Sequence, residues 1–146
     1  MKSKMVIVVV PREGRKLTKE QTIHEVAINS IMALLNIGGE IKTGQLTFKL
    51  TDTPSSSGIP MGWFNGDSQF NIEVIRIMNK DDVKTLHYWC KSEGIPSSLG
   101  NYNGEESVLV IGPSWDQKIE DIMHRSISSD KFIRPLTTEK KKENTK

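Results

Sequence analysis

The sequence predicts an α/β domain built on a mixed β-sheet of four to five strands, with helices on both faces. Apolar runs typical of buried strands alternate along the chain with segments of helical periodicity, an order that places helices over a partly parallel sheet. The chain has 146 residues, which fits one domain, and it shows no internal repeats. We therefore expect a single domain at 1–136, with a variable insertion of strand and loop at 40–67, and a disordered basic tail at 137–146.

The first predicted strand is an unbroken valine-rich run at Met5 to Pro11, which suits a central strand covered on both faces. A basic turn follows, and Thr18 and Gln21 have the spacing of a capping box that opens a helix. This helix should run to about Ile37. The apolar stripe that we expect to face the sheet consists of Ile23, Val26, Ala27, Ile31, Leu34 and Leu35.

The remaining elements follow from the same two periodicities. We expect a strand at 40–50, a turn-rich stretch at 51–62 with a mobile loop near 55–58, and a strand at 70–78. Asn79 should cap the next helix, which Gly94 ends. A buried strand at 107–111, a short helix opened by a capping box at Ser114 and an edge strand at 132–136 complete the domain.

The composition excludes several classes of protein. Cys90 is the only cysteine, and the histidines at 24, 87 and 124 are isolated in the sequence, so we expect no disulfide, no metal and no cofactor. The longest apolar run, Met5 to Val10, is far shorter than the roughly 20 residues of a membrane helix. We expect a soluble, cytoplasmic protein that does not contact a membrane.

A cluster of basic residues indicates where a ligand could bind. The net charge of +2 is small, but Arg12, Arg15, Lys16 and Lys19 lie in one short segment. Because a helix start presents unpaired amide groups and a partial positive charge, this segment predicts a phosphate site. The alternative is a solvated surface, which is how we interpret the lysines of the tail.

His24 lies one turn into the first helix, within its apolar stripe, with Gln21 at the edge of the stripe. A histidine in this place can act as a general base or a positioning group near neutral pH. A core histidine bonded to a backbone carbonyl is the structural alternative.

Two further segments are candidates for binding. Gly112 ends the strand at 107–111, and ligands collect beyond the carboxyl ends of strands, although simple chain reversal also explains the turn. Asn101 and Tyr102 lie in a predicted loop at 99–104, where the tyrosine ring could stack on a base and where the alternative is ordinary turn chemistry. Trp63 and Phe64 form a similar platform or attach their loop to the core.

The order of these features resembles that of the type II peptidyl-tRNA hydrolases of archaea and eukaryotes. That family has a valine-rich strand, a Gly/Lys-rich turn, a helix carrying Gln-x-x-His, a helix ending in Gly-Leu-Pro and a strand reading like Val-Leu-x-Ile-Gly-Pro. The counterparts here are Met5 to Val10, Gly14-Arg15-Lys16, Gln21 to His24, Gly94-Ile95-Pro96 and Val108 to Pro113. The resemblance covers most of the chain outside 40–67 and the tail.

The resemblance implies hydrolysis of the ester between a peptide and tRNA. His24 and Gln21 would position or activate water, Lys16 or Arg15 would stabilise negative charge, and the basic turn would hold tRNA phosphates. By analogy with the family, we also expect a homodimer.

The chain also departs from the family at three positions. The family's lysine register falls on Leu17, its acidic Asp-Ala-Gly-x-Thr-Gln loop has no counterpart, and its helix alanine is replaced by Glu25. The sequence therefore leaves two functions open: an ester hydrolase, or a non-catalytic module that binds a nucleotide or RNA.

Overall fold

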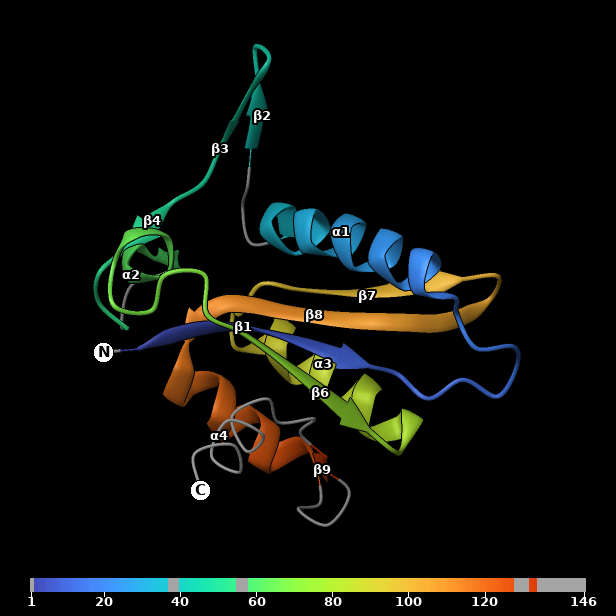
Figure 1. The fold of residues 1–146 in the computed structure, drawn as a ribbon. Helices are drawn as coiled ribbons and strands as arrows, with labels where there is room; N and C mark the ends of the chain where they lie inside the picture. The colour runs from blue at the N-terminus through green and yellow to red at the C-terminus, as the bar shows by residue number, and fades with distance from the viewer. Residues whose placement is uncertain (1, 37–39, 55–57, 128–131, 134–146) are drawn as a thin grey trace, which may run out of the picture.

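The computed structural model describes residues 2–36, 40–54, 58–127 and 132–133, in which five strands form one mixed sheet of order β7-β8-β1-β6-β9 (Figure 1). The central strand β1 (Ser3–Val9) is parallel to β6 (Ile72–Ile77) and antiparallel to β8 (Glu105–Trp115). The outer strands β7 (Ser97–Tyr102) and β9 (Phe132–Ile133) are antiparallel to their neighbours. The predicted α/β class with a mixed sheet is confirmed.

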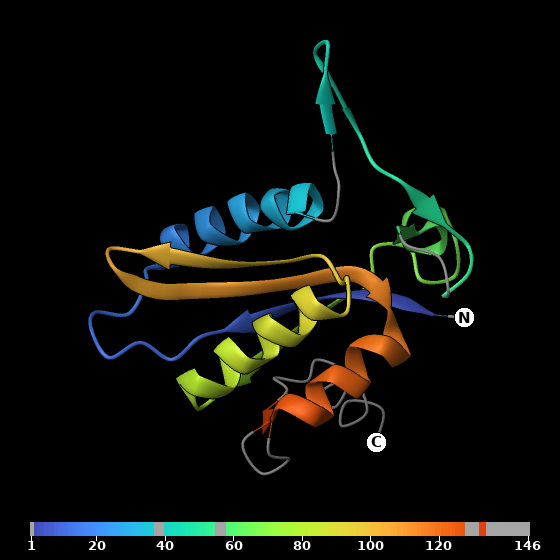
Figure 2. The same ribbon diagram turned by 180° about the vertical axis from the view of Figure 1, so that it is seen from behind.

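Helices cover both faces of the sheet (Figures 1 and 2). One face carries α3 (Lys80–Ser92) and α4 (Asp116–Ser126), and the other carries α1 (Lys19–Asn36), which lies over β7 and β8. The short helix α2 (Met61–Asn65) packs on the same face as α1, near the start of β1. The sheet therefore separates two apolar clusters, of which the larger lies under α3 and α4.

The valine-rich run of β1 explains why this strand is central. Val6 and Val8 are fully buried in the cluster under α3 and α4, whereas Met5 points to the other face and packs with Trp63. Alternation along a strand sends successive side chains to opposite faces, so an apolar residue is favoured at every position. The expected burial on both faces is confirmed.

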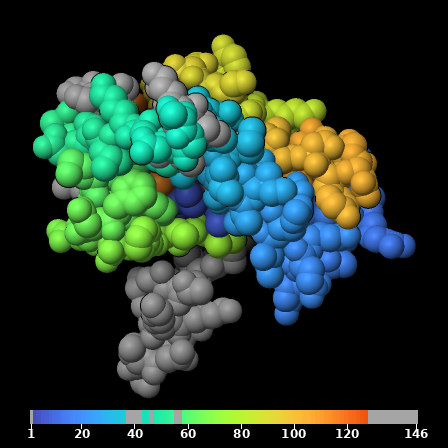
Figure 3. All heavy atoms as spheres, turned by 90° about the horizontal axis from the view of Figure 1, so that it is seen from above, coloured from blue at the N-terminus to red at the C-terminus, as the bar shows by residue number. Residues whose placement is uncertain are grey.

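The insertion does not form the single strand that the sequence predicts. It folds into a hairpin of β2 (Glu40–Lys42) and β3 (Gln45–Thr47), followed by a parallel pair, β4 (Leu50–Thr51) and β5 (Ile59–Pro60). Thr43 and Gly44 form the turn with φ angles of 52° and 78°, the left-handed backbone that a two-residue hairpin turn requires. The hairpin stands away from the sheet, and from above the insertion gathers beside the C-terminal end of α1 (Figures 1 and 3).

The predicted inward face of α1 is wrong for much of its length, although Val26 of the predicted stripe packs against the apolar cluster on this side of the sheet. Ile23 and Ile31 are 63% and 55% exposed, and the buried residues are Glu25, Asn29 and Ala33. The reason lies in the strands beneath the helix, which offer small and polar partners there. Hydrogen bonds to those partners outweigh the apolar stripe in setting the rotation of the helix.

The predicted loop at 99–104 is also wrong, because most of it belongs to β7. The turn is confined to Asn103 and Gly104, whose φ angles of 53° and 84° again match a two-residue hairpin turn. The predicted capping box at Ser114 is wrong as well. Ser114 lies in β8, and Trp115 precedes α4 without a side-chain capping bond.

Other sequence signals are confirmed. Thr18 and Gln21 form the predicted reciprocal capping box, and the side chain of Asn79 accepts a 2.8 Å hydrogen bond from the amide of Asp81. Part of the last predicted strand is present as β9, while 134–136, the tail at 137–146 and the loop centre at 55–57 lie outside the described residues. Among the described residues, no helix combines the length and apolar character needed to span a membrane.

Candidate functional site

A cavity of about 510 Å³ lies where β1 ends and α1 begins. Because β1 and β6 are parallel, their carboxyl ends meet at this edge of the sheet, which is where ligands collect in α/β folds. The cavity is lined by Val9, Val10, Pro11, Arg12, Lys16, Leu17, Thr22, Arg76, Ile77, Met78, Ser107 and Val108. None of these residues is acidic, so the described lining is cationic.

Lys16 and Arg76 are the two cations at the cavity that remain available. Both side chains are exposed, and neither makes an ion pair with a residue that the structure describes. Lys16 comes from the turn after β1, and Arg76 comes from the end of β6. The two parallel strands therefore bring together two positive charges that lie 60 positions apart.

Arg12 also lines the cavity, but its guanidinium is occupied. It is 9% exposed and donates to the carbonyl oxygens of Tyr102, Glu105 and Glu106 at 3.1–3.2 Å. Its Nε donates to the carbonyl oxygen of Arg15. Arg12 thus attaches the basic turn to the tip of the β7–β8 hairpin, and its hydrogen-bonding groups are used in this structural contact.

Glu105 completes this attachment. Its carboxylate accepts hydrogen bonds from Lys80 at 2.9 Å and from the backbone amides of Glu13 and Gly14. The bond from Lys80, followed by that from the Glu13 amide, lowers the pKa of Glu105 to about 2. The carboxylate therefore stays ionised at neutral pH and holds the turn that carries Lys16.

The start of α1 adds a partial positive charge. Thr18 Oγ1 accepts from the Gln21 amide, and Gln21 Oε1 accepts from the Thr18 amide. On this side the cavity is lined by Leu17, just before the cap, and by Thr22, in the first turn of α1. A helix start attracts anions through its dipole, so this wall favours a negatively charged group.

One wall of the cavity carries a hydroxyl bonded to a buried carboxylate. Ser107 Oγ donates to Glu25 Oε1 at 2.5 Å, and the two residues are 2% and 7% exposed. The side chain of Glu25 forms no ion pair with any cation in the described part of the chain. The hydroxyl proton of Ser107 is committed to Glu25, and its oxygen can still accept a hydrogen bond.

A β-bulge places Ser107 on the α1 side of the sheet. Leu99 pairs with Leu109 and Asn101 pairs with Glu106. An advance of two residues along β7 therefore corresponds to an advance of three residues along β8. An extra residue in one strand turns two successive side chains to the same face. Ser107 contacts α1 on the same side as Val108, which strict alternation would forbid.

Gly100 leaves space for this polar contact. A Cβ atom on Gly100 would lie 2.4 Å from Asn29 Nδ2, 2.4 Å from Ser107 Oγ and 3.0 Å from Glu25 Oε1. The network continues to Ser98, whose hydroxyl donates to Asn29 Oδ1 at 2.6 Å. α1 is therefore attached to the sheet by a buried polar network at the back of the cavity.

Only part of the predicted site comes together. Lys16 and Arg12 line the cavity, and Arg15 and Lys19 are exposed residues of the adjoining segment. His24 is exposed and does not line the cavity. At about 100° per residue, His24 is rotated roughly 200° from Thr22 around the helix, so the two face nearly opposite directions.

Three other predicted residues have structural contacts in the described chain. Gln21 Nε2 donates to the hydroxyl of Tyr102 at 2.9 Å, which joins α1 to β7. Asn101 Oδ1 accepts from the Gly104 amide at 2.9 Å and stabilises the hairpin turn. Neither Asn101 nor Tyr102 lines the cavity.

The predicted ligand-binding residue Gly112 does not line the cavity. A Cβ on Gly112 would lie 2.7 Å from the Lys4 carbonyl oxygen, at the start of β1, whereas the cavity is at the end of β1. Because β8 is antiparallel to β1, its carboxyl end lies at the edge of the sheet opposite to the cavity.

The sequence interpretation missed Arg76, Ser107 and Glu25. The position of Arg76 at the end of an apolar strand could have indicated it, since the strand was predicted and its carboxyl end follows directly. In the sequence Glu25 differs from the alanine of the resembling family, and nothing there indicates that it is buried. No pattern in the sequence indicates the bulge that brings Ser107 to the cavity.

Among the described residues, no group of three or more His, Cys, Asp or Glu side chains is arranged to hold a metal ion. A comparison with known protein families finds no family model that matches the chain, and a search of curated proteins finds no significant match.

Proposed function

We propose that this protein binds a nucleoside phosphate, either free or at the end of an RNA, in the cationic cavity between β1, β6 and α1. The observation that carries the proposal is the pair of cations, Lys16 and Arg76, at an apolar cavity with no acidic residue in its described lining. Two unpaired charges in this position attract phosphate, and the start of α1 adds to the attraction.

The size and walls of the cavity support a ligand larger than a phosphate ion. Its volume of about 510 Å³ falls within the range of small-molecule sites, roughly 300–1,000 Å³. Val9, Leu17 and Met78 supply apolar surface on which a base could pack. A nucleoside phosphate combines an apolar ring with a charged group and so matches both halves of this lining.

The position of His24 favours binding over the hydrolysis that the family resemblance implies. His24 lies on the exposed side of α1, and Gln21 is used in the capping box and in the bond to Tyr102. The two side chains that would activate water are therefore not directed at the cavity. A module that binds without chemistry requires only the cations and the apolar wall.

The test is a titration with AMP, ATP and a short RNA hairpin carrying a single-stranded 3′ end. We expect binding that weakens with rising salt, because phosphate contacts release counterions. The double variant Lys16→Gln, Arg76→Gln should lose at least about tenfold in affinity, the equivalent of ~1.4 kcal/mol. Lys84→Gln, which removes an exposed charge from α3 on the other face, should change affinity by less than about twofold. Equal binding by wild type and the double variant would disprove the proposal.

Ester hydrolysis is the second candidate, and the contact between Ser107 and Glu25 favours it. A serine hydroxyl that donates to a carboxylate can lose its proton to that carboxylate as it attacks an ester carbon. The proton then passes from Glu25 to the departing ribose oxygen, and water hydrolyses the acyl-serine. Lys16 and Arg76 would hold the phosphates of the tRNA end.

A release assay with N-blocked aminoacyl-tRNA tests this candidate. If Ser107 is the nucleophile, Ser107→Ala abolishes release while His24→Ala retains it. If the residues implied by the resemblance act instead, the two variants give the reverse result. If wild type releases nothing while it binds the RNA hairpin, hydrolysis is excluded and the binding proposal stands.

A further inference from the structure

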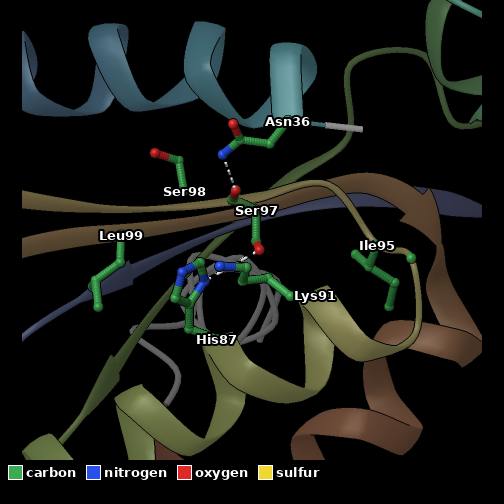
Figure 4. Close-up of a pocket in the computed structure, with 8 residues that line it drawn as sticks. Asn36, His87, Lys91, Ile95, Ser97, Ser98 and Leu99 are labelled. Atoms are coloured by element: carbon green, nitrogen blue, oxygen red, sulfur yellow. Dashed lines mark hydrogen bonds between the residues drawn. The ribbon is translucent and has the colours of Figure 1, made fainter. Parts of the chain in front are cut away.

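A second cavity, of about 400 Å³, lies at the other end of α1 (Figure 4). It is bounded by Asn36, the last residue of α1, by the end of α3 and by the outer strand β7. The first cavity lies at the start of α1, and a helix of 18 residues spans about 27 Å at 1.5 Å per residue. The two cavities are therefore separate.

Three polar side chains meet in this second cavity. His87 and Lys91 are four positions apart on α3, so they share one face of the helix. Ser97 Oγ lies 3.2 Å from His87 Nδ1, and the carbonyl oxygen of Ser97 accepts from Asn36 Nδ2 at 2.9 Å. Figure 4 shows Lys91 extending towards His87 and Ser97 on the α3 side of β7.

These contacts leave two donors for a ligand. The side chain of Lys91 makes no ion pair or hydrogen bond with a residue that the structure describes. When the Ser97 hydroxyl donates to Nδ1 of a neutral His87, the ring proton lies on Nε2. The described lining contains no carboxylate, and Glu93, just after α3, pairs with Arg125 at 3.7 Å.

The ends of α1 and α3 each oppose an anion at this cavity, and each does so more weakly than Lys91 attracts one. A helix C-terminus carries roughly −0.5 of an elementary charge, whereas Lys91 carries a full positive charge. The last carbonyl groups of α3 are also occupied, since those of Trp89, Cys90 and Lys91 accept from the amides of Glu93, Ile95 and Gly94. Lys91 is the only formally charged side chain in the described lining, so the cavity favours an anion over a cation.

The same cavity has an apolar part. Ile95 is buried at 3% exposure, and Leu99 packs against the apolar cluster under α3 and α4. Both residues line the cavity together with Lys91 and His87. A ligand that fills it should join an anionic group to a short apolar body.

We infer that this cavity binds a small organic anion, with its carboxylate or phosphate at Lys91 and His87 and its apolar part on Ile95 and Leu99. The site differs from the nucleoside phosphate site in position, lining and size. Its ligand is distinguished from a free inorganic ion by the apolar contact.

The test follows the imidazole signals of His87 by NMR during titration with hexanoate, butyl phosphate, inorganic phosphate and butylamine. The chain has 3 histidines, so His24 and His124 serve as internal controls. We expect hexanoate or butyl phosphate to shift the His87 signals with a Kd of about 1 mM or below. A titration up to about 10 mM ligand covers this range. Inorganic phosphate should bind more weakly, and butylamine should not bind.

Lys91→Gln should weaken the binding by about tenfold, while Lys84→Gln on the same helix should leave it within about twofold. Lys91 is exposed, so its replacement should not prevent folding. The inference fails if His87 moves no more than His24 and His124, if Lys91→Gln binds as well as wild type, or if inorganic phosphate binds as tightly as the organic anions. A preference for hexanoate over butyl phosphate assigns a carboxylate ligand, and the reverse assigns a phosphate monoester.

Discussion

The carboxylate of Glu25 in α1 accepts a 2.5 Å hydrogen bond from the hydroxyl of Ser107 in β8, across 82 positions of sequence. This contact joins the helix to the sheet through polar groups, where an amphipathic helix normally uses apolar ones. It also places a buried negative charge directly behind a cationic cavity. Both the attachment of α1 and the chemistry of the cavity therefore depend on the same pair.

Gly100→Ala should destabilise the protein by about 1–3 kcal/mol, the usual cost of overpacking. The new Cβ would lie 2.4 Å from both Asn29 Nδ2 and Ser107 Oγ, so the network must shift. Urea denaturation measures the loss. Gly62→Ala is the control, because a Cβ there meets no atom within 4 Å and alanine favours the helix α2. Equal stability of Gly100→Ala and wild type would show that the helix is not held as described.

Glu25→Gln should raise the free energy of unfolding at pH 7 by about 1 kcal/mol. The reason is that burying a neutral amide costs less desolvation than burying a carboxylate that has no cation beside it. Glutamine keeps a carbonyl oxygen that accepts from Ser107. Thermal unfolding of Glu25→Gln and of wild type measures this change. Glu20→Gln is the control for loss of charge without burial, because Glu20 is exposed in the first turn of α1. The prediction is contradicted if Glu25→Gln loses more stability relative to wild type than Glu20→Gln does.

His87 should titrate below its ordinary pKa of 6.5, because burial and then the charge of Lys91 lower its pKa. The neutral ring therefore contributes stability that is fully present above pH 6.5 and is lost as the pH falls through the pKa of the folded state. NMR titration of the ring gives the value directly. Lys91→Gln should raise the pKa part of the way, since burial is the larger cause. A His87 pKa at or above 6.5 in the wild type contradicts this.

Lys4→Met should destabilise the protein by about 2–3 kcal/mol, somewhat less than a fully buried pair because its partners are partly exposed. Lys4 is 6% exposed and contacts Glu73 at 3.0 Å, Asp116 at 2.9 Å and Glu120, so its loss leaves three carboxylates together. Lys2→Met, at an exposed neighbouring position, is the control and should have little effect.

The pH dependence gives a second check on Lys4. Burial works to lower the pKa of Lys4, but the hydrogen bonds to Glu120, Asp116 and Glu73 outweigh it and raise the pKa above 10.5. The stabilising contribution is therefore present below pH 10.5 and is lost as the pH rises through the folded-state pKa. The difference between wild type and Lys4→Met should narrow in that alkaline range, and a constant difference would contradict the assignment.

Local signals in the sequence were sufficient for much of the fold. The valine run gave the central strand, and the Thr18–Gln21 and Asn79 caps gave two helix starts, because each signal depends on neighbouring residues alone. The basic turn also indicated Lys16 at the cavity. The hydrolase activity and the homodimer implied by the family resemblance stay predictions.

The rotation of α1 could not be predicted from its own residues. Its apolar stripe is continuous, yet the strands beneath it present Gly100, Ser98 and Ser107, and these contacts join positions far apart in the chain. The prediction that His24 lies within the buried face failed with that rotation. Arg76 was missed for a related reason, since its meeting with Lys16 requires the parallel pairing of β1 and β6.

The bulge in β8 constrains how the tip of its hairpin can change in length. Deleting one residue between Glu106 and Leu109 would remove the extra position and turn Glu105 to the opposite face, away from Lys80 and the basic turn. The basic turn that carries Lys16 would then lose its hydrogen bonds to Glu105, although neither Lys16 nor Arg76 had been replaced. Insertions and deletions at this tip are compatible with the ligand site only in steps of two residues.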